Sequence, residues 1–255
     1  MVILEEPWWV KTFRPEFYYR LEGFPDEQST VCHVDFIIKA LSLPPGAKVL
    51  DIGCGIGRHS IELAKRLLWM LGVDYSHAFL LTARQKAAHR KNTCFVQADM
   101  RKLPIHQHIF QGAIIMQNTF GMFEHEDNLH VLRGVGDCLA PGGRLLLDIQ
   151  NREYIAAMFS QGTLSTVKQD AQGILEWEEW FDRDTSQSFA RVLLKDSQGE
   201  LLESLEYRWR EYSLSEMNAM LCSCGFEVIT VYGSMSGAAF ESSSPKMITL
   251  ARWIG

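Results

Sequence analysis

Two patterns of hydrophobic and polar residues alternate along most of the chain: short continuous apolar runs, and segments in which apolar residues recur at helical spacing. Short apolar runs, typical of buried parallel strands, occur at residues 49–52, 71–73, 94–96, 110–116 and 145–149. Between these runs, apolar residues recur at the spacing of one helix face, at residues 29–42, 61–67, 78–90 and 129–139. Strands that alternate with helices in this way predict an α/β fold, doubly wound around a mostly parallel sheet.

The pattern changes after residue 150. Apolar and polar residues then alternate in three segments separated by polar turns, at 174–181, 188–195 and 201–212, which predicts a three-stranded antiparallel meander. A helix is predicted at 215–221, and two more strands at 226–232 and 246–253. Because a sheet of roughly 60 residues buries little core alone, the aromatic side chains of Trp177, Tyr207 and Trp209 need cover from the rest of the chain.

This pattern divides the chain into three parts. We expect a main α/β domain formed by residues 31–150 and 213–255. We expect residues 151–212 to be an antiparallel β insertion that covers the substrate, since α/β folds place specificity in such insertions. Residues 1–30 form an aromatic N-terminal segment, with Trp8-Trp9 and Phe17-Tyr18-Tyr19, that we also expect to act as a lid.

The first predicted strand leads into a glycine-rich turn and then a helix, in the sequence KVLDIGCGIGRHSIELAK of residues 48–65. Gly53, Gly55 and Gly57 lack the Cβ atoms that would keep a ligand from the backbone at the end of the strand. A dinucleotide-binding turn needs a further glycine where this chain has Arg58. S-adenosylmethionine has no phosphate and carries an ammonium, so Asp51 favours this cofactor over NAD, although glycine-rich turns also serve packing alone.

Acidic residues also follow the second and third predicted strands. Asp74 ends the second, where its carboxylate could accept both ribose hydroxyls, and Asp99 ends the third, where it could accept the adenine amine. Tyr75 and Met100 would then flank the adenine. One such aspartate alone more often caps a helix, but three at neighbouring strand ends predict a shared cofactor site.

These motifs resemble those of the class I S-adenosylmethionine-dependent methyltransferases over residues 31–150 and 213–253. The segments that carry the resemblance are DIGCGIGRH, GVDYS, QADM, GAIIMQNTFGMF and LAPGGRLLLDI. The family implies a Rossmann-like methyltransferase fold, with a seven-stranded sheet whose last strand is inserted antiparallel, and in this subgroup a small-molecule acceptor and an antiparallel β insertion. It also implies that Gln117 contacts the cofactor and Asn118 the acceptor. Residues 65–70 depart from the family, because they lack the glycine that often precedes the second strand.

The expected chemistry makes few demands on the protein. The methyl group of the cofactor is already electrophilic, so holding the acceptor in line can be sufficient for transfer. If a base is needed, His33, His125 or Tyr19 could supply it, although each such residue is more often a surface or capping residue. We expect Arg58 to pair with a nearby carboxylate, and we expect no metal.

Composition narrows the class of protein further. The chain has 255 residues, and its 25 Lys and Arg against 31 Asp and Glu give a net charge of −6. An acidic balance disfavours DNA and large RNA substrates. No apolar run reaches the roughly 18 residues of a membrane span, and the first residues lack a secretory signal pattern. We therefore expect a cytoplasmic protein whose six cysteines are reduced.

The hypothesis that follows is a small-molecule methyltransferase that uses S-adenosylmethionine. A non-catalytic, cofactor-binding regulatory protein and an RNA methyltransferase stay open as alternatives, and an NAD-dependent dehydrogenase is disfavoured. The residues leave the acceptor atom and the oligomeric state open, with a homodimer among the options.

Overall fold

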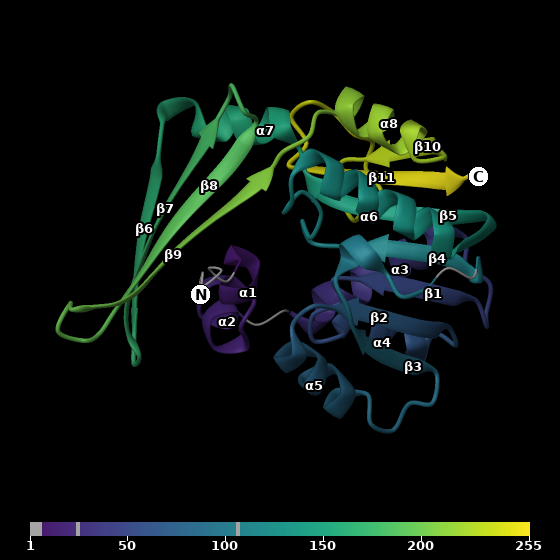
Figure 1. The fold of residues 1–255 in the computed structure, drawn as a ribbon, viewed down its shortest axis with the longest axis horizontal. Helices are drawn as coiled ribbons and strands as arrows, with labels where there is room; N and C mark the ends of the chain where they lie inside the picture. The colour runs from purple at the N-terminus through teal and green to yellow at the C-terminus, as the bar shows by residue number, and fades with distance from the viewer. Residues whose placement is uncertain (1–6, 24–25, 106–107) are drawn as a thin grey trace, which may run out of the picture.

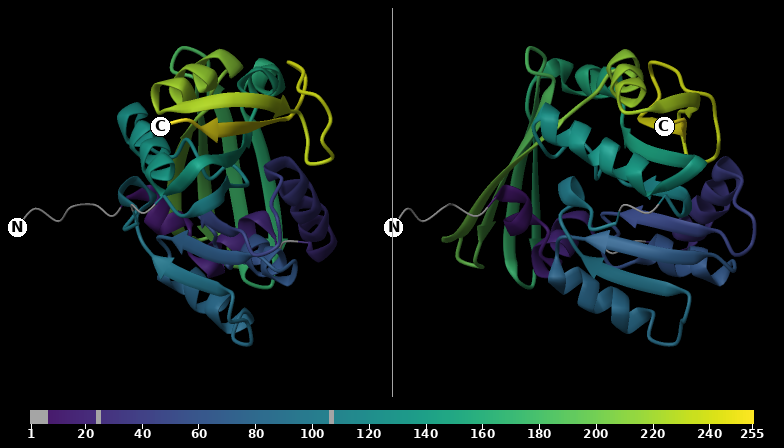
Figure 2. Two further views of the ribbon diagram at one scale, coloured as in Figure 1. Left: turned by 90° about the vertical axis from the view of Figure 1, so that its right-hand side faces the viewer. Right: turned by 45° about the vertical axis from the view of Figure 1, so that its right-hand side comes forward.

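Two β-sheets organise the structure, a computed structural model that describes residues 7–23, 26–105 and 108–255 (Figure 1). The larger sheet is built mainly from the first half of the chain and the C-terminus, and the second sheet from the segment between them. The two sheets lie beside each other, with the N-terminal helices between them (Figures 1 and 2). Residues 1–6 and 24–25 of the predicted N-terminal segment lie outside the described residues.

The larger sheet has seven strands in the order β10-β11-β5-β4-β1-β2-β3. They are β1 (Lys48–Ile52), β2 (Trp69–Asp74), β3 (Thr93–Gln97), β4 (Phe110–Ile115), β5 (Leu139–Gln150), β10 (Phe226–Tyr232) and β11 (Lys246–Trp253). The first five strands are parallel to one another, and β11 is inserted antiparallel between β5 and β10. The predicted doubly wound, mostly parallel seven-stranded sheet is thereby confirmed.

Helices cover both faces of this sheet, which places hydrophobic core on each side. They are α3 (Glu27–Leu41), α4 (Arg58–Lys65), α5 (His77–Lys86), α6 (His125–Cys138) and α8 (Leu214–Ser223), and the helical segments α7 (Arg152–Met158), η1 (Met100–Lys102) and η2 (Phe159–Gln161) lie at the strand ends. Successive residues of a strand point to opposite faces. Val49 therefore packs in the cluster that contains residues of α3 and α4, while Leu50 packs in the cluster with residues of α6 and α8.

Side-chain caps explain where several of these helices begin. The carboxylate of Asp26 accepts a hydrogen bond from the backbone N–H of Ser29 at 2.6 Å at the start of α3. At the start of α8, Ser213 and Glu216 form a capping box. Such caps satisfy backbone N–H groups that have no partner inside the helix.

The connection from α4 to β2 is made without the glycine that the family often has there. Leu67 takes the left-handed conformation itself, with φ of 64°, and its side chain is 69% exposed. Its carbonyl accepts a hydrogen bond from the N–H of Gly46 at 2.8 Å, and the amide of Asn92 donates to the carbonyls of Ala64 and Leu68. These bonds hold a leucine in a conformation that usually favours glycine.

The sequence predicts a turn at Pro141-Gly142-Gly143, between the helix at 129–139 and the strand at 145–149, but in the structure β5 already begins at Leu139. Phe110 of β4 pairs with Leu139, whereas Gly112 pairs with Arg144. The turn residues therefore form a bulge within β5 rather than a loop before it. The glycine-rich pattern correctly indicated irregular backbone but not its place inside a strand.

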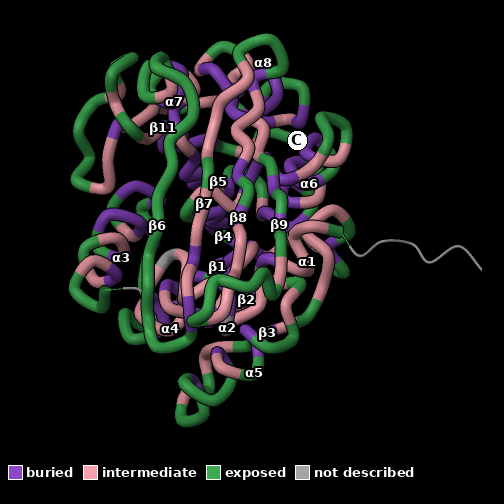
Figure 3. The backbone as a smooth tube through the Cα atoms, turned by 90° about the vertical axis from the view of Figure 1, so that its left-hand side faces the viewer, coloured by how far each residue is buried: buried purple, intermediate pink, exposed green. Residues whose placement is uncertain are grey.

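The second sheet has four strands in the order β6-β7-β8-β9, so the prediction of three strands was wrong. The strands are β6 (Leu164–Asp170), β7 (Gly173–Asp182), β8 (Gln187–Lys195) and β9 (Leu201–Arg210). Every residue of β6 is exposed, so its sequence has no apolar face from which a strand could be predicted (Figure 3). It lies at the edge of the sheet and pairs only with β7 among the described strands.

The N-terminal helices α1 (Trp8–Thr12) and α2 (Pro15–Glu22) cover the inner face of this second sheet. Phe17 is buried in a cluster with Leu175, Val192 and Leu205. The Trp8 ring lies edge-on to that of Trp209 with centroids 5.3 Å apart, and the Trp9 ring is 5.1 Å from that of Phe123, beside the larger sheet. The predicted cover for the aromatic face is thus provided in part by the N-terminal segment, while the division into domains stays a prediction.

Candidate functional site

The glycine turn joins β1 to α4 at the carboxyl end of the larger sheet. Gly53 has φ of 69°, and a Cβ placed on it would lie 2.2 Å from Cγ2 of Thr119. Gly55 has φ of 54°, and a Cβ there would meet no atom within 4 Å. The first glycine therefore allows close contact with the loop after β4, and the second leaves backbone open to a ligand.

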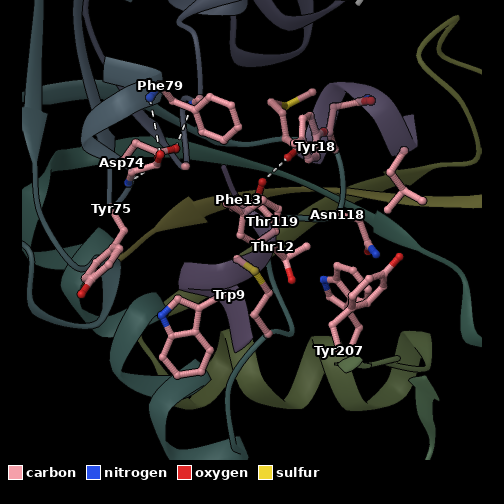
Figure 4. Close-up of a pocket in the computed structure, with 18 of the residues that line it drawn as sticks. Trp9, Thr12, Phe13, Tyr18, Asp74, Tyr75, Phe79, Asn118, Thr119 and Tyr207 are labelled. Atoms are coloured by element: carbon pink, nitrogen blue, oxygen red, sulfur yellow. Dashed lines mark hydrogen bonds between the residues drawn. The ribbon is translucent and has the colours of Figure 1, made fainter. Parts of the chain in front are cut away.

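Asp74, at the end of β2, is bound to this turn. Its Oδ2 accepts a hydrogen bond from the N–H of Gly55 and its Oδ1 one from the N–H of Ser76, both at 2.8 Å (Figure 4). Burial raises the pKa of this carboxyl, and the backbone hydrogen bonds oppose that effect. Each oxygen keeps a further lone pair for a ligand hydroxyl.

Asp51 lies deeper, at the end of β1, and is only 2% exposed. Its Oδ2 accepts a hydrogen bond from the hydroxyl of Ser60 at 2.6 Å. Burial raises the pKa of Asp51 to about 6, and the bond from Ser60 reduces that shift. A buried carboxylate of this kind is stabilised by a positively charged ligand group placed next to it.

Asp99 has a strong partner of its own, which the sequence did not indicate. The guanidinium of Arg101 donates to Asp99 Oδ1 from Nε at 3.0 Å and to Oδ2 from Nη2 at 2.6 Å. Partial burial raises the pKa of Asp99, but the hydrogen bonds from Arg101 outweigh it and leave the pKa below its ordinary value. Arg101 also stacks over the rings of Trp9 and Phe123, at 5.3 and 4.6 Å from their centroids. This aspartate is therefore ionised and held in place.

The loop after β4 holds two consecutive residues in the left-handed region. Gln117 and Asn118 have φ of 57° and 58°. Buried Asp148 of β5 accepts the N–H of Gln117 at 2.9 Å through Oδ2, and its backbone carbonyl accepts the N–H of Asn118 at 3.0 Å. The side-chain oxygen of Asn118 accepts the N–H of Gln150 at 3.1 Å. These bonds hold a backbone conformation that is unfavourable without glycine.

One cavity of about 780 Å³ brings these elements together. Its lining includes nearly all of the predicted site residues: Tyr19, His33, Asp51, Gly53, Gly55, Asp74, Tyr75, Asp99, Met100, Gln117 and Asn118. Gly57 is absent from the lining, and a Cβ on it would lie 2.7 Å from the ring of Phe95. Gly57 thus serves the packing of the turn, and His125, exposed at the start of α6, also lies outside the lining.

Other lining residues were not predicted as site residues. Figure 4 shows Trp9, Thr12 and Phe13 of the N-terminal segment facing the same space as Tyr207 of β9. Phe79 of α5 and Lys246 of β11 also contribute. The aromatic N-terminal motif and the aromatic face of the insertion were the available signals, but sequence alone does not bring such distant segments together.

The proposed bases differ in protonation. Burial and the charge of Arg58 lower the pKa of His33, whereas burial raises the pKa of Tyr19. His33 is therefore neutral near pH 7 and Tyr19 is protonated. The ring nitrogens of His33 lie 3.3 Å from Nε2 of His59 and 3.3 Å from the hydroxyl of Ser29.

The sequence analysis predicts that Arg58 pairs with a nearby carboxylate, and the structure shows that this prediction is wrong. Its Nη1 donates to the hydroxyl of Thr30 at 3.0 Å, and no carboxylate of the described chain lies within ion-pair distance. In the same described ranges, no three His, Cys, Asp or Glu side chains are grouped as metal ligands, and no helix is long and apolar enough to cross a membrane.

Glu211 is buried behind the cavity wall, and its burial predicts that the folding stability of the protein falls as pH rises. Its Oε1 accepts the hydroxyl of the lining residue Ser188 at 2.8 Å, and burial raises the pKa of Glu211 from 4.5 to about 7. Because the folded state binds this proton more tightly than the unfolded state, stability is lost as pH rises from about 4.5 through about 7. The Glu211→Gln variant has no such group to titrate. We therefore expect its free energy of unfolding to rise by about 3 kcal/mol relative to that of wild type between pH 4.5 and pH 8.

Urea denaturation of both proteins across that pH range measures the difference. Glu206→Gln is the matched control, because Glu206 lies on exposed β9 surface and pairs with Arg191. Parallel stability curves for wild type and Glu211→Gln would contradict the prediction.

Comparisons with known proteins agree with the geometry. The family model described as a methyltransferase domain matches residues 49–143. The YqeM protein of Bacillus subtilis (strain 168) is 25% identical over 214 residues, covering 83% of this chain and 86% of that protein. The ubiquinone biosynthesis O-methyltransferase of Xanthomonas campestris pv. campestris (strain B100) is 28% identical over 205 residues, 74% of this chain and 80% of that protein.

Among solved structures, the CcbJ methyltransferase from Streptomyces caelestis has a similar fold, with a TM-score of 0.78 at 18% identity over 98% of this chain and 97% of that one. The sheet order, the glycine turn with its neighbouring aspartates, the match of the family model and the curated relatives all agree. The chain belongs to the class I S-adenosylmethionine-dependent methyltransferases, and its cofactor is S-adenosylmethionine.

Proposed function

We propose that this enzyme transfers a methyl group from S-adenosylmethionine to a small-molecule acceptor. The observation that supports the proposal is a cavity in which the open glycine turn, Asp51, Asp74 and Asp99 share their space with the aromatic face of the second sheet. Its volume of about 780 Å³ falls in the range of roughly 300–1,000 Å³ that is typical of small-molecule sites.

The residues at the glycine turn fit the cofactor. Gly55 presents backbone to the cavity without a Cβ, and the free lone pairs of Asp74 suit the two ribose hydroxyls. Asp51 is a buried carboxylate that would pair with the ammonium group. When bound, S-adenosylmethionine supplies a methyl group on a positively charged sulfur, which a nucleophile can take by in-line displacement.

The adenine end would lie toward η1. The backbone N–H, Nε and Nη2 of Arg101 donate to the two oxygens of Asp99, and the adenine amine would share one of these oxygens, with Tyr75 and Met100 on either side of the ring. Gln117 would contact the cofactor from the loop after β4, where Asp148 holds it. These four roles are the ones that the sequence analysis predicts.

The acceptor would lie between the loop after β4 and the second sheet. Asn118 lines the cavity there, and Tyr207 and Trp209 close the opposite side. We propose that these residues orient the acceptor and exclude water, so that positioning provides most of the rate. His33 is the better of the two candidate bases, since it is neutral near pH 7 and could accept a proton through Ser29.

A small acceptor is favoured over RNA by the walls of the cavity and by the charge of the chain. Helices α1 and α2 and the second sheet line the side opposite the glycine turn, and the net charge of the chain is −6, whereas nucleic-acid surfaces are typically basic. The relative from Xanthomonas campestris is named for O-methylation in ubiquinone biosynthesis, which is also chemistry on a small molecule.

Two measurements test the proposal. Isothermal titration of wild type with S-adenosylhomocysteine is expected to give saturable heat, and the protein incubated with methyl-labelled cofactor and a metabolite extract is expected to label a small molecule. Binding heat without transfer of the labelled methyl group would favour the non-catalytic regulatory protein. Label that moved only to an added RNA fraction would favour the RNA methyltransferase. Absence of heat would refute cofactor binding.

A further inference from the structure

Glu211 is a buried carboxyl group that the proposed cofactor contacts do not use. It lies directly after β9 and is only 1% exposed. Its Oε1 accepts a hydrogen bond from the hydroxyl of Ser188 at 2.8 Å, and Ser188 lines the cavity. Because the one proton of this hydroxyl is used in that bond, Oγ of Ser188 presents only lone pairs to a ligand. One hydroxyl thus links a buried carboxylate to the cavity.

Lys246 places this pair on the side of the cavity where we propose that the acceptor lies. Among the described residues, Lys246 is the charged group that acts on Glu211. Its ammonium also lies 3.4 Å from Oδ1 of Asp148, whose backbone carbonyl accepts the N–H of Asn118 at 3.0 Å. The carboxylate and its serine are therefore on the side of the cavity that carries Asn118.

A neighbouring indole also indicates that a ligand contacts this wall. Trp209 lies directly opposite Ser188 in the ladder between β8 and β9, and both residues line the cavity. The Nε1 atom of Trp209 is buried, and none of the described residues accepts a hydrogen bond from it. A buried donor without a partner costs free energy, so an acceptor atom of a bound ligand would stabilise it. The wall then offers a donor beside the lone pairs of Ser188.

Burial favours a proton on Glu211 and opposes one on His33. A proton removes the charge of a buried carboxylate, whereas it creates a charge on an imidazole. Burial raises the pKa of Glu211 to about 7, although the hydrogen bond from Ser188 and the charge of Lys246 oppose this effect. Burial lowers the pKa of His33, and the charge of Arg58 adds to that effect. Since a base is most effective when its pKa lies near the working pH, Glu211 is better suited than His33 to accept a proton.

We propose that Ser188 and Glu211 accept the proton of the methyl acceptor, with Ser188 in contact with the acceptor and Glu211 acting through it. The inference rests on the proposed function and adds the route of the proton. It also narrows the acceptor to a molecule that carries a proton on its nucleophilic oxygen or nitrogen.

The proposed step balances in atoms and charge. As the acceptor heteroatom bonds to the methyl carbon, the carbon–sulfur bond breaks and its electron pair stays on sulfur. The acceptor proton passes to Oγ of Ser188, and the hydroxyl proton of Ser188 passes to Oε1 of Glu211. The positive charge on sulfur and the negative charge of Glu211 are lost together, so neither is left buried without a partner.

The first test compares binding of S-adenosylmethionine and S-adenosylhomocysteine, which differ by the methyl group and the positive charge on sulfur. Under the proposed arrangement this charge lies close enough to Glu211 to stabilise its ionised form and lower its pKa. The affinity for S-adenosylmethionine relative to S-adenosylhomocysteine should therefore rise by about 5- to 10-fold between about pH 5.5 and pH 8.5. In Glu211→Gln this rise should be largely lost. Isothermal titration of both proteins with both ligands measures the ratio.

The controls separate Glu211 from other titrating groups. Asp51 and Asp74 are present in wild type and in Glu211→Gln alike, so their share of the pH dependence remains in the variant. Glu206→Gln removes an exposed carboxylate of β9 and should keep the wild-type rise. Ser188→Ala keeps the buried carboxyl and should show the rise at higher pH, because Glu211 loses a hydrogen bond that lowers its pKa.

The second test follows the labelled methyl group from the cofactor to the small molecules of a metabolite extract. At pH 7 and saturating cofactor, we expect Ser188→Ala and Glu211→Gln each to reduce the initial rate by about 100-fold or more, the typical contribution of a positioned acid or base. Ser188→Thr keeps a hydroxyl and should retain much of the rate. The wild-type rate should fall as pH drops through the pKa of Glu211, and Glu211→Gln should lack this fall.

Two results would overturn the inference. The first is an affinity ratio with the same pH dependence in wild type and in Glu211→Gln, and the second is label transfer by Ser188→Ala at the wild-type rate. Failure of the proposed function looks different, because wild type would then label no small molecule, while the affinity ratio would still report on Glu211.

Discussion

Asp74→Ala is expected to weaken binding of S-adenosylhomocysteine by at least about 100-fold. The carboxylate accepts the N–H groups of Gly55 and Ser76, and we propose that it also accepts the ribose hydroxyls. Charge-assisted hydrogen bonds contribute about 1.5–3 kcal/mol each, so loss of two ligand bonds corresponds to a factor of roughly 100 or more. The truncation also leaves two backbone donors without a partner and loosens the glycine turn.

Isothermal titration of wild type and variant gives the two dissociation constants. Asp196→Ala is the matched control, because Asp196 also accepts two backbone N–H groups, of Gln198 and Glu200, but lies outside the cavity lining. The control should lose some stability and keep its affinity within about twofold. An Asp74→Ala protein that is folded and binds as tightly as wild type would exclude the proposed ribose contact.

Asp148→Ala is expected to destabilise the protein by about 3 kcal/mol, the low end of the cost of breaking a buried ion pair, because the side chain of Lys246 is 32% exposed. Asp148 is fully buried, its Oδ1 lies 3.4 Å from the ammonium of Lys246, and its Oδ2 holds the N–H of Gln117. Alanine leaves the ammonium without its partner and releases the loop in which Gln117 and Asn118 hold positive φ. The loss should therefore appear in folding stability as well as in ligand binding.

Chemical denaturation at pH 7 measures this effect, with Lys246→Met as the complementary variant. Because each single change leaves the other charge without its partner, the double variant should lose clearly less stability than the sum of the two single losses. The exposed pair Arg191 and Glu206 is the control, and its removal should cost less than about 1 kcal/mol. Additive losses at Asp148 and Lys246 would show that the two charges do not stabilise each other.

The larger sheet and most of its cofactor-side residues could be predicted because their signals are local. A buried run, a glycine turn and an acidic strand end lie within a few residues of one another, and parallel strands bring such ends to one edge of a sheet. Asp51, Asp74 and Asp99 line one cavity for this reason.

What the sequence missed depends on contacts between distant segments or on strands without an apolar face. The exposed residues of β6 follow no hydrophobic period, so only pairing with β7 reveals that strand. The pair of Asp148 and Lys246 joins strands almost a hundred residues apart in sequence. Leu67 adopts a glycine-like conformation that backbone hydrogen bonds support and that residue type argues against.

Helix α1 contacts both walls of the cavity, through Trp8 on Trp209 and through Trp9 on Phe123. Because α1 packs on both sides, a change in the distance between the second sheet and the loop that carries Phe123 would disturb at least one of these two ring contacts. Widening of the space for a bulkier guest would therefore require α1 to shift as well.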